Sequence, residues 1–376
     1  MHTDRPLDAA PLVPVKLPDS SLLSEFVMQQ LPLIVVMIGL GFASAWLQYG
    51  YLPGADTPFP LAGVRVPIWH LIWMGFWTGY TMAIVGEAAG IFVLPYQISI
   101  LHFENAAVTP TTQLITFLNP IGALLGFRRT GQWNLDFARW VCLGGFVGGF
   151  VGPFIRLTVL ADSRPFTLAV GFALAIAGLH LCLSALGVFK IKDPIGQKFA
   201  AAAAAQRAAR LSPAGLPKGL RVETLAKGGG SLTIGFWGER WTMNTRLLFF
   251  VGFGVASVAT ALGVGGGFLL VPIFAALYHL PMYVLVAASI PFVIVLSGVG
   301  IFTYIVIIPI FVGTSLPPEF AWGFFAAAGG SFGAWCAAKT QRFVPQHFLK
   351  LMLGGITGAA GLLYITDFFF KLPFRI

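Results

Sequence analysis

Two glycine-rich segments hold the residues whose types and spacing could bind a ligand. The clearer one is Gly263-Val264-Gly265-Gly266-Gly267, which Pro272 follows within an apolar run from Leu247 to Tyr278. Glycine has no side chain to support a helix and proline has no backbone N–H, so we expect the helix to break here. The N–H groups freed at such a break, with the partial positive charge of a helix N-terminus, would bind an anion without any lysine or arginine.

A weaker counterpart of this segment occurs in the first half of the chain. It reads Gly86-Glu87-Ala88-Ala89-Gly90, and Pro95 follows it at the spacing at which Pro272 follows Gly263. An internal repeat explains this match and a second one, in which Gly148, Gly149 and Gly152 correspond to Gly329, Gly330 and Gly333. We predict that the two glycine–proline segments form the substrate site, with Pro95 and Pro272 as helix breaks. The other six glycines are typical of close helix packing.

Polar residues begin the apolar runs that follow the two segments. Thr111, Thr112 and Gln113 follow the first segment, and Ser289 follows the second. Hydroxyl and amide groups can donate hydrogen bonds to an anion, although any of them could instead bond to a carbonyl of its own helix. We include these four residues in the candidate substrate-binding set.

Glu87 is the ionisable residue of the first segment. An ionisable group at membrane depth is costly and is by default a functional candidate. A permanent carboxylate would repel an anion, so we interpret Glu87 as a candidate for carrying a coupled proton. The alternative is that the segment reaches water and that Glu87 is simply solvated.

Catalytic and metal-binding chemistry is not indicated by the sequence. His70, His102, His180 and His279 are scattered, and the three cysteines lie in apolar runs without CxxC spacing. The sequence holds no paired carboxylates, nucleophile motif or phosphate-binding loop. We therefore predict no catalytic residue, no metal and no cofactor.

The composition is that of a membrane protein. Of the 376 residues 57% are hydrophobic and 10% are charged, and the mean hydropathy is +0.83, whereas soluble domains carry roughly 25% charged residues. The net charge of +9 lies mostly in loops, where it sets topology. We therefore predict an all-α polytopic membrane protein whose partners include membrane lipid and no nucleic acid.

The apolar runs divide the chain into five parts. They are a polar tail (1–30), an N-terminal transmembrane helix (31–49), a first repeat (67–189), a basic connection (190–246) and a second repeat (247–370). In the connection, Ala200–Ala205 with the basic residues after it favours a short helix, and Gly235–Trp241 is typical of a lipid-facing segment.

Charge bias indicates how the two interrupted runs meet the membrane. If every run crossed once, Lys339 and Arg342 would lie outside, against the positive-inside tendency. If each interrupted run is a re-entrant hairpin, 18 of the 23 lysines and arginines lie inside. The outside then holds Arg65, Arg156, Arg164, Lys371 and Arg375.

The hairpin arrangement predicts seven crossings, with the N-terminus in the cytoplasm and the C-terminus outside. Each repeat then has one hairpin plus three transmembrane helices, an odd number of crossings, so the two repeats are inverted. Inverted repeats with broken helices are a recurring transporter plan.

The spacing Gly263-x-Gly265-Gly266-Gly267-x-x-x-x-Pro272, with Ala288-Ser289 and the small residues of Gly329–Gly333 after it, resembles the sulfite exporter TauE/SafE family of membrane permeases. The resemblance covers about residues 69–189 and 247–365. It implies transport of sulfite, an organosulfonate or a related sulfur-containing anion across the cytoplasmic (inner) membrane. It also implies that the ligand is held between inverted repeats.

Together these observations favour a secondary transporter that works by alternating access, with export as the direction implied by the resemblance. Two alternatives stay open at this point. One is an anion channel of the same fold, and the other is an intramembrane enzyme. The oligomeric state is not determined by the sequence.

Overall fold

The computed structural model is a bundle of helices with two small sheets. It describes residues 26–28, 30–85, 90–103, 105–127, 134–187, 221–280, 282–340 and 346–370. Four residues of the first glycine segment, Gly86, Glu87, Ala88 and Ala89, lie outside the described residues, as does the predicted basic helix after Ala200.

The elements follow the apolar runs. The helices are α2 (Leu31–Tyr49), α3 (Ile68–Val85), α4 (Gly90–Pro95), α5 (Val108–Phe127), α6 (Leu135–Thr158), α7 (Ser163–Ala185), α9 (Thr245–Leu262), α10 (Gly267–Tyr278), α11 (Met282–Phe302), α12 (Ile308–Val312), α13 (Phe320–Thr340) and α14 (Gln346–Phe370). Two π-helical segments, η2 (Tyr96–Ile100) and η3 (Thr303–Ile307), continue α4 and α11. The strands are β1 (Thr57–Phe59), β2 (Val64–Val66), β3 (Glu223–Gly228), β4 (Ser231–Phe236) and β5 (Glu239–Asn244).

Six helical stretches in the described part are long and apolar enough to cross a membrane: α2, α6, α7, α9, the continuous stretch Ala288–Val312, and Lys350–Phe370 of α14. The protein is therefore a multi-pass membrane protein. The predicted crossings α5 and α13 are helical but are not among the six. Threonine, glutamine and asparagine lower the hydropathy of α5, and glycine, serine and tryptophan lower that of α13.

The two interrupted runs each contain a longer helix and a shorter one, α3 with α4 and α9 with α10. α9 has 18 residues and rises about 27 Å, close to the roughly 30 Å of a hydrocarbon core. α3 also has 18 residues. Each run therefore begins with a helix of nearly full length and continues with a shorter one.

The helix break lies at glycine rather than at proline. Gly263 ends α9 with φ +81°, a left-handed conformation that glycine adopts without strain. Pro95 and Pro272 lie inside α4 and α10, so their predicted role as helix breaks is wrong. Proline removes one hydrogen bond from a helix. After Pro95 the wider π turn of η2 accommodates this loss, and in α10 the buried side chains around Pro272 offset it.

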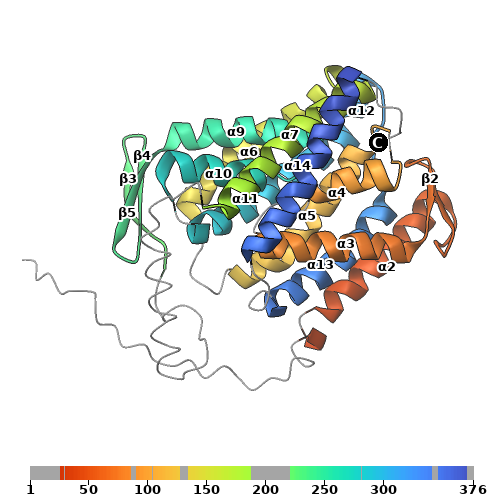
Figure 1. Ribbon diagram of the computed structural model, residues 1–376, viewed down its shortest axis with the longest axis horizontal. Coiled ribbons are helices and arrows are strands. Elements are labelled where there is room, and N and C mark those ends of the chain that lie inside the picture. The colour runs from red at the N-terminus through yellow and green to blue at the C-terminus, as the bar shows by residue number, and fades with distance from the viewer. Residues whose placement is uncertain are drawn as a thin grey trace, which may run out of the picture.

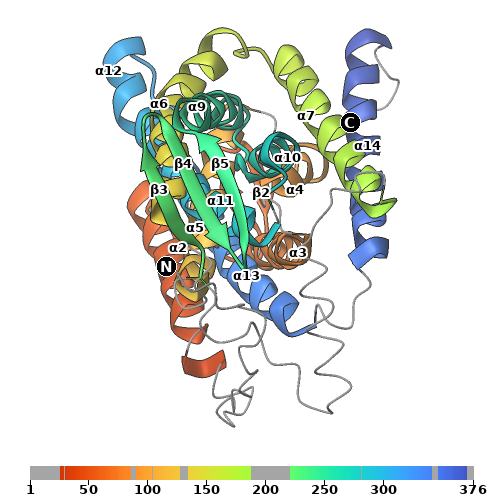
Figure 2. The ribbon, with the colours of Figure 1, turned by 90° about the vertical axis from the view of Figure 1, so that its left-hand side faces the viewer.

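Glycines bring two pairs of helices into close contact, α6 along α9 and α13 along α3. A Cβ added to Gly148 or Gly152 would collide with the backbone of α9, and one added to Gly329 or Gly333 would collide with the backbone of α3. Gly149 and Gly330 face the side chains of Val299 and Asn119. The packing role predicted for these glycines is confirmed. α7 and α14 form a third pair at one side of the bundle (Figure 2).

The all-α prediction is wrong for two segments. β1 and β2 form an antiparallel hairpin within the predicted loop after α2, and β3, β4 and β5 form an antiparallel sheet within the basic connection. Alternating burial along β4 explains the second sheet, because Leu232, Ile234 and Phe236 all face inward. The two sheets lie at opposite ends of the helical bundle (Figure 1).

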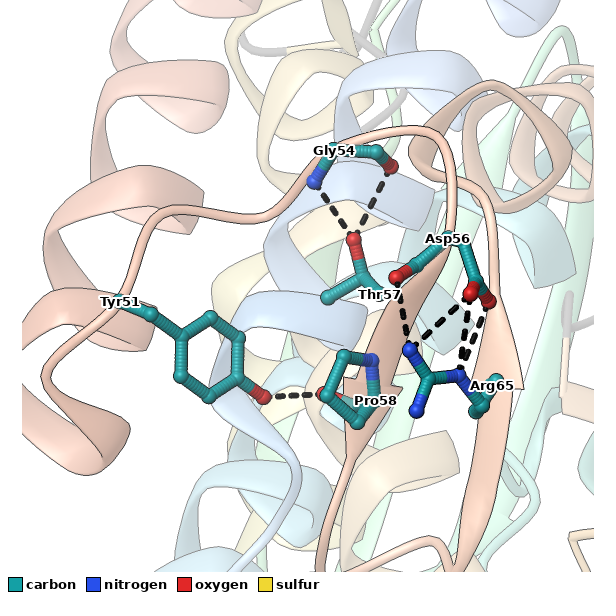
Figure 3. A network of polar contacts seen from close by, with 6 residues as sticks. All are labelled: Tyr51, Gly54, Asp56, Thr57, Pro58 and Arg65. Carbon is teal, nitrogen blue, oxygen red and sulfur yellow. Dashed lines mark hydrogen bonds and ion pairs between the residues drawn. The ribbon is translucent and has the colours of Figure 1, made fainter.

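The β1–β2 hairpin is held by short-range polar contacts (Figure 3). Arg65 pairs with Asp56 across the hairpin, with Nη2 3.0 Å from Oδ2, and the Thr57 hydroxyl donates to Gly54 O at 2.9 Å. Both charged side chains are exposed, and Arg65 lowers the pKa of Asp56 through hydrogen bonding. An exposed pair of this kind contributes little to stability.

Candidate functional site

The two glycine segments meet inside the bundle. A Cβ placed on Gly90, the first residue of α4, would lie 2.8 Å from Cα of Val264 and 3.0 Å from the backbone N of Gly265. Gly90 and all five residues from Gly263 to Gly267 are buried. Glycine is needed at position 90 because a larger residue would displace the second segment.

The second segment presents backbone N–H groups at the start of α10. Leu270 N donates to Gly266 O at 2.9 Å and closes the first turn. Within the described part of the chain, the N–H groups of Gly267 and Phe268 have no acceptor. The first N–H groups of a helix carry its partial positive charge. These groups are therefore free to bind an anion.

Helix α5 lines the contact between the segments with a hydroxyl group. Thr116 Cγ2 would lie 2.7 Å from a Cβ on Gly90. The Thr116 hydroxyl donates to Gln113 O at 2.9 Å and lies 3.2 Å from Ser297 Oγ of α11. All three polar residues are buried.

Thr112 and Gln113 reach neighbours on both sides of α5. The Thr112 hydroxyl donates to Gln97 Oε1 of η2. Gln113 Nε2 donates at 3.0 Å to the carbonyl of Thr260, in the last turn of α9. The other amide atoms, Gln97 Nε2 and Gln113 Oε1, are buried and have no partner in the described part of the chain. A buried polar atom without a partner costs about 1–3 kcal/mol, so these amides indicate room for a polar ligand or water.

The remaining predicted residues have other surroundings. The Thr111 hydroxyl donates to Ala107 O at 2.7 Å and accepts from Glu319 N at 2.8 Å, so it holds the loop before α13. Ser289 is buried in α11, one turn before Phe292. The ring of Phe292 would lie 2.8 Å from a Cβ on Gly266. The structure therefore brings Gly90 and Gln113 to the second segment and places Thr111 in a loop contact.

Three polar residues of this region were not predicted: Gln97, Thr116 and Ser297. Each is a polar residue inside an apolar helical run, which is the signal that marks it in the sequence. That signal does not say which face of the helix the residue occupies. The fold decides that these three are buried around α5, where Thr116 lies next to Gly90, rather than facing lipid.

Arg156, which the charge bias predicts to lie outside, is a buried side chain in the structure. It is 1% exposed and lies in the last turn of α6. Its Nε donates to Thr109 Oγ1 at 3.1 Å, its Nη1 donates to Leu160 O, and its guanidinium lies 4.0 Å from the centre of the Phe166 ring. Thr109 in turn touches the second segment, because a Cβ on Gly263 would lie 2.7 Å from Thr109 O. Thr109 therefore lies between the Arg156 guanidinium and the second glycine segment.

Glu319 is the buried carboxylate nearest to a predicted site residue. Its Oε1 accepts from Tyr49 Oη at 2.7 Å, and its Oε2 accepts from the backbone N–H groups of Leu61 and Ala62 at 3.2 and 3.3 Å. Burial raises the pKa of Glu319, and these hydrogen bonds oppose the shift. This residue ties α2, the β1–β2 hairpin and Thr111 together.

Metal chemistry has no support in the described part of the chain. No group of three or more histidine, cysteine, aspartate and glutamate side chains is placed there to hold an ion. The three cysteines are free thiols on α6, α7 and α13.

These features define a multi-pass membrane protein whose two broken apolar runs meet at buried hydroxyl, amide and backbone N–H groups. The chain belongs to the sulfite exporter TauE/SafE family, whose model matches residues 21–181 and 71–364. No curated protein and no solved structure matches the chain. Membership of this family indicates a membrane transporter of sulfite or a related anion rather than an enzyme.

Proposed function

We propose that the protein is a secondary transporter that binds one small sulfur-containing anion, sulfite or an organosulfonate, where its two glycine segments meet. The observation that carries the proposal is the contact of Gly90 with Val264 and Gly265. A Cβ on Gly90 would also meet Thr116 Cγ2 of α5, and the buried Thr116 hydroxyl lies 3.2 Å from Ser297 Oγ, so we place these hydroxyls in the same site. Hydroxyl and backbone N–H groups donate to oxyanions, and the Thr116 hydroxyl would turn from Gln113 O to the ligand when it binds. The described groups at this contact carry no negative charge to repel an anion.

The helix pairing supports alternating access between two inverted repeats. In the two proposed repeats α3 corresponds to α9, α4 to α10, α5 to α11, α6 to α13 and α7 to α14. The contact of α6 with α9 is then the counterpart of the contact of α13 with α3. Two further pairs, α5 with α11 and α7 with α14, then join each helix to its own counterpart. Because α3 packs on α13 and α9 packs on α6, the first helix of each repeat would move together with the other repeat. The ligand between the segments would be exposed to one side at a time.

Coupling and direction complete the proposal. Glu87 lies next to the contact in the sequence, and we propose it as the carrier of a coupled proton. We place the protein in the cytoplasmic membrane, with export as its direction, because the family description names an exporter. A channel of the same fold would conduct without alternating closure, so saturation of the transport rate at low substrate concentration would contradict it.

Thermal unfolding of the purified protein against an anion panel tests the site. The panel contains sulfite, sulfate, thiosulfate, taurine, sulfoacetate and chloride. A ligand that binds only the folded state raises the unfolding temperature as its concentration rises. We expect sulfite or an organosulfonate to raise the unfolding temperature. In Thr116→Val the anion concentration that gives half of this rise should be about tenfold higher, which is the order of one hydrogen bond to a charged group.

Thr366→Val is the matched control. It also removes a hydroxyl that bonds to a helix carbonyl, but this residue is exposed on α14. It should bind the anion as the wild type does. A shift from a carboxylate or a cation alone would end the sulfur assignment, and equal binding by Thr116→Val and Thr366→Val would remove the glycine contact as the site.

A further inference from the structure

Arg156 carries a buried positive charge that the described residues do not neutralise. Every acceptor around its guanidinium is neutral: Thr109 Oγ1 at 3.1 Å, Leu160 O, and Ala161 O at 3.4 Å. Within the described residues no carboxylate forms an ion pair with it. A buried charge without a counter-charge is costly, and an anion would supply the missing charge.

Tyr304 supplies an independent sign of a ligand beside this cation. Its side chain is fully buried in η3, and its hydroxyl has no partner in the described part of the chain. A buried hydroxyl without a partner is rare in proteins. The π-helical turn that carries Tyr304 is itself a feature found frequently at functional sites.

The packing of α6 on α11 brings the two residues together. A Cβ on Gly145 would lie 2.7 Å from the Phe292 ring, and one on Gly149 would lie 3.0 Å from Val299. The two helices therefore run side by side in the same direction. Two turns after Gly149 comes Arg156, where α6 packs on η3, the segment that carries Tyr304.

We propose that Arg156 and Tyr304 form a second anion subsite, which takes the same sulfur oxyanion as it enters or leaves the glycine contact. The guanidinium provides charge and the phenol provides one hydrogen bond. Thr109, which touches both Arg156 and Gly263, links the subsite to the second segment. Both groups are buried in this conformation, so the subsite fills when this end of the bundle opens. The inference rests on the proposed transport of a sulfur oxyanion.

Tyr304→Phe is the primary test because it removes only the hydroxyl. No described residue bonds to that hydroxyl, so the unfolding temperature without ligand should not fall. The affinity of Tyr304→Phe for sulfite should fall about tenfold. It is measured by the sulfite-dependent rise in unfolding temperature and by uptake of labelled sulfite into vesicles. Tyr278→Phe is the control, because it removes a phenol hydroxyl at the far end of α10, and it should bind sulfite as the wild type does.

Arg156→Gln is the second variant, and its half-maximal sulfite concentration should rise more than that of Tyr304→Phe, because the positive charge is gone while the glycine contact still binds sulfite. If Arg156 only anchors the backbone of Leu160, Arg156→Gln will unfold at lower temperature while Tyr304→Phe keeps the wild-type affinity, and that result overturns the subsite. If sulfite stabilises the wild type and Thr116→Val alone weakens binding, the proposed function stands without the subsite. If no sulfur anion stabilises the wild type, the proposed function fails as well.

Discussion

At the scale of single residues, the carboxylate of Glu319 shows two opposing effects. Burial disfavours its charged form, and hydrogen bonds from Tyr49 and from the backbone of the β1–β2 hairpin favour it. Burial is the larger effect, so the pKa of Glu319 is raised above its ordinary value of 4.5. The folded protein then holds a proton more tightly than the unfolded chain does.

This linkage predicts how stability depends on pH. Below pH 4.5 Glu319 is protonated in both states, and its contribution to stability is fully present. As the pH rises through the raised pKa of the folded state, that contribution is lost. We expect Glu319→Gln to flatten this fall in unfolding temperature, because a glutamine amide can still donate to Tyr49 Oη and accept from Leu61 N.

Glu223→Gln is the control for this measurement. It removes an exposed carboxylate on β3, and it should leave the pH dependence of the wild type unchanged. An equally steep fall in Glu319→Gln would show that Glu319 is not the titrating group.

At the scale of elements, the contact between α4 and the turn before α10 depends on the absence of a side chain. A methyl group at Gly90 would lie 2.8 Å from Cα of Val264, which is backbone and cannot rotate away. We expect Gly90→Ala to lower stability by about 1–3 kcal/mol through overpacking. We also expect it to abolish sulfite binding, because the two segments would be pushed apart.

Gly254→Ala on α9 is the matched control. It lies on the helix that ends in the second segment, but a Cβ there meets no atom within 4 Å. It should keep both stability and sulfite binding, as measured by thermal unfolding with and without sulfite. Normal binding by Gly90→Ala would contradict a ligand at this contact.

At the scale of the whole molecule, the two sheets mark the ends of the bundle (Figure 1). The proposed topology places the β1–β2 hairpin outside the cell and the β3–β5 sheet in the cytoplasm. Ala55 and Ala226 are exposed residues in these two regions. In a variant without Cys142, Cys182 and Cys336, we expect a membrane-impermeant maleimide to label Ala55→Cys in intact cells.

Ala226→Cys is the complementary variant, and it should react only after the cells are permeabilised. Unchanged transport activity of both variants would show that the cysteines leave the fold intact. Labelling of both in intact cells would contradict the placement of the sheets on opposite sides, and the reverse pattern would invert the proposed topology.

The sequence by itself determined the class of protein, the positions of the long helices and the glycine segment at which the second apolar run breaks. Hydropathy, proline and glycine act through local chain geometry, so a single segment is enough to reveal them. The packing glycines were also predictable, because small residues repeated along a helix favour close approach. The sheet of β3–β5 was missed because its alternation of buried and exposed residues is short and lies between basic, glycine-rich stretches.

Only the tertiary structure decided which polar residues meet. Thr111 bonds to Glu319, Thr116 lies beside Ser297, and Arg156 contacts Thr109, all between different elements. A sequence shows that a side chain is polar, but the packing of other helices decides whether it faces lipid, a loop or a ligand. Arg156 shows the reason most clearly. The sequence shows only that it lies near the end of an apolar run, and the packing of Phe166 and Thr109 around it makes it a buried cation.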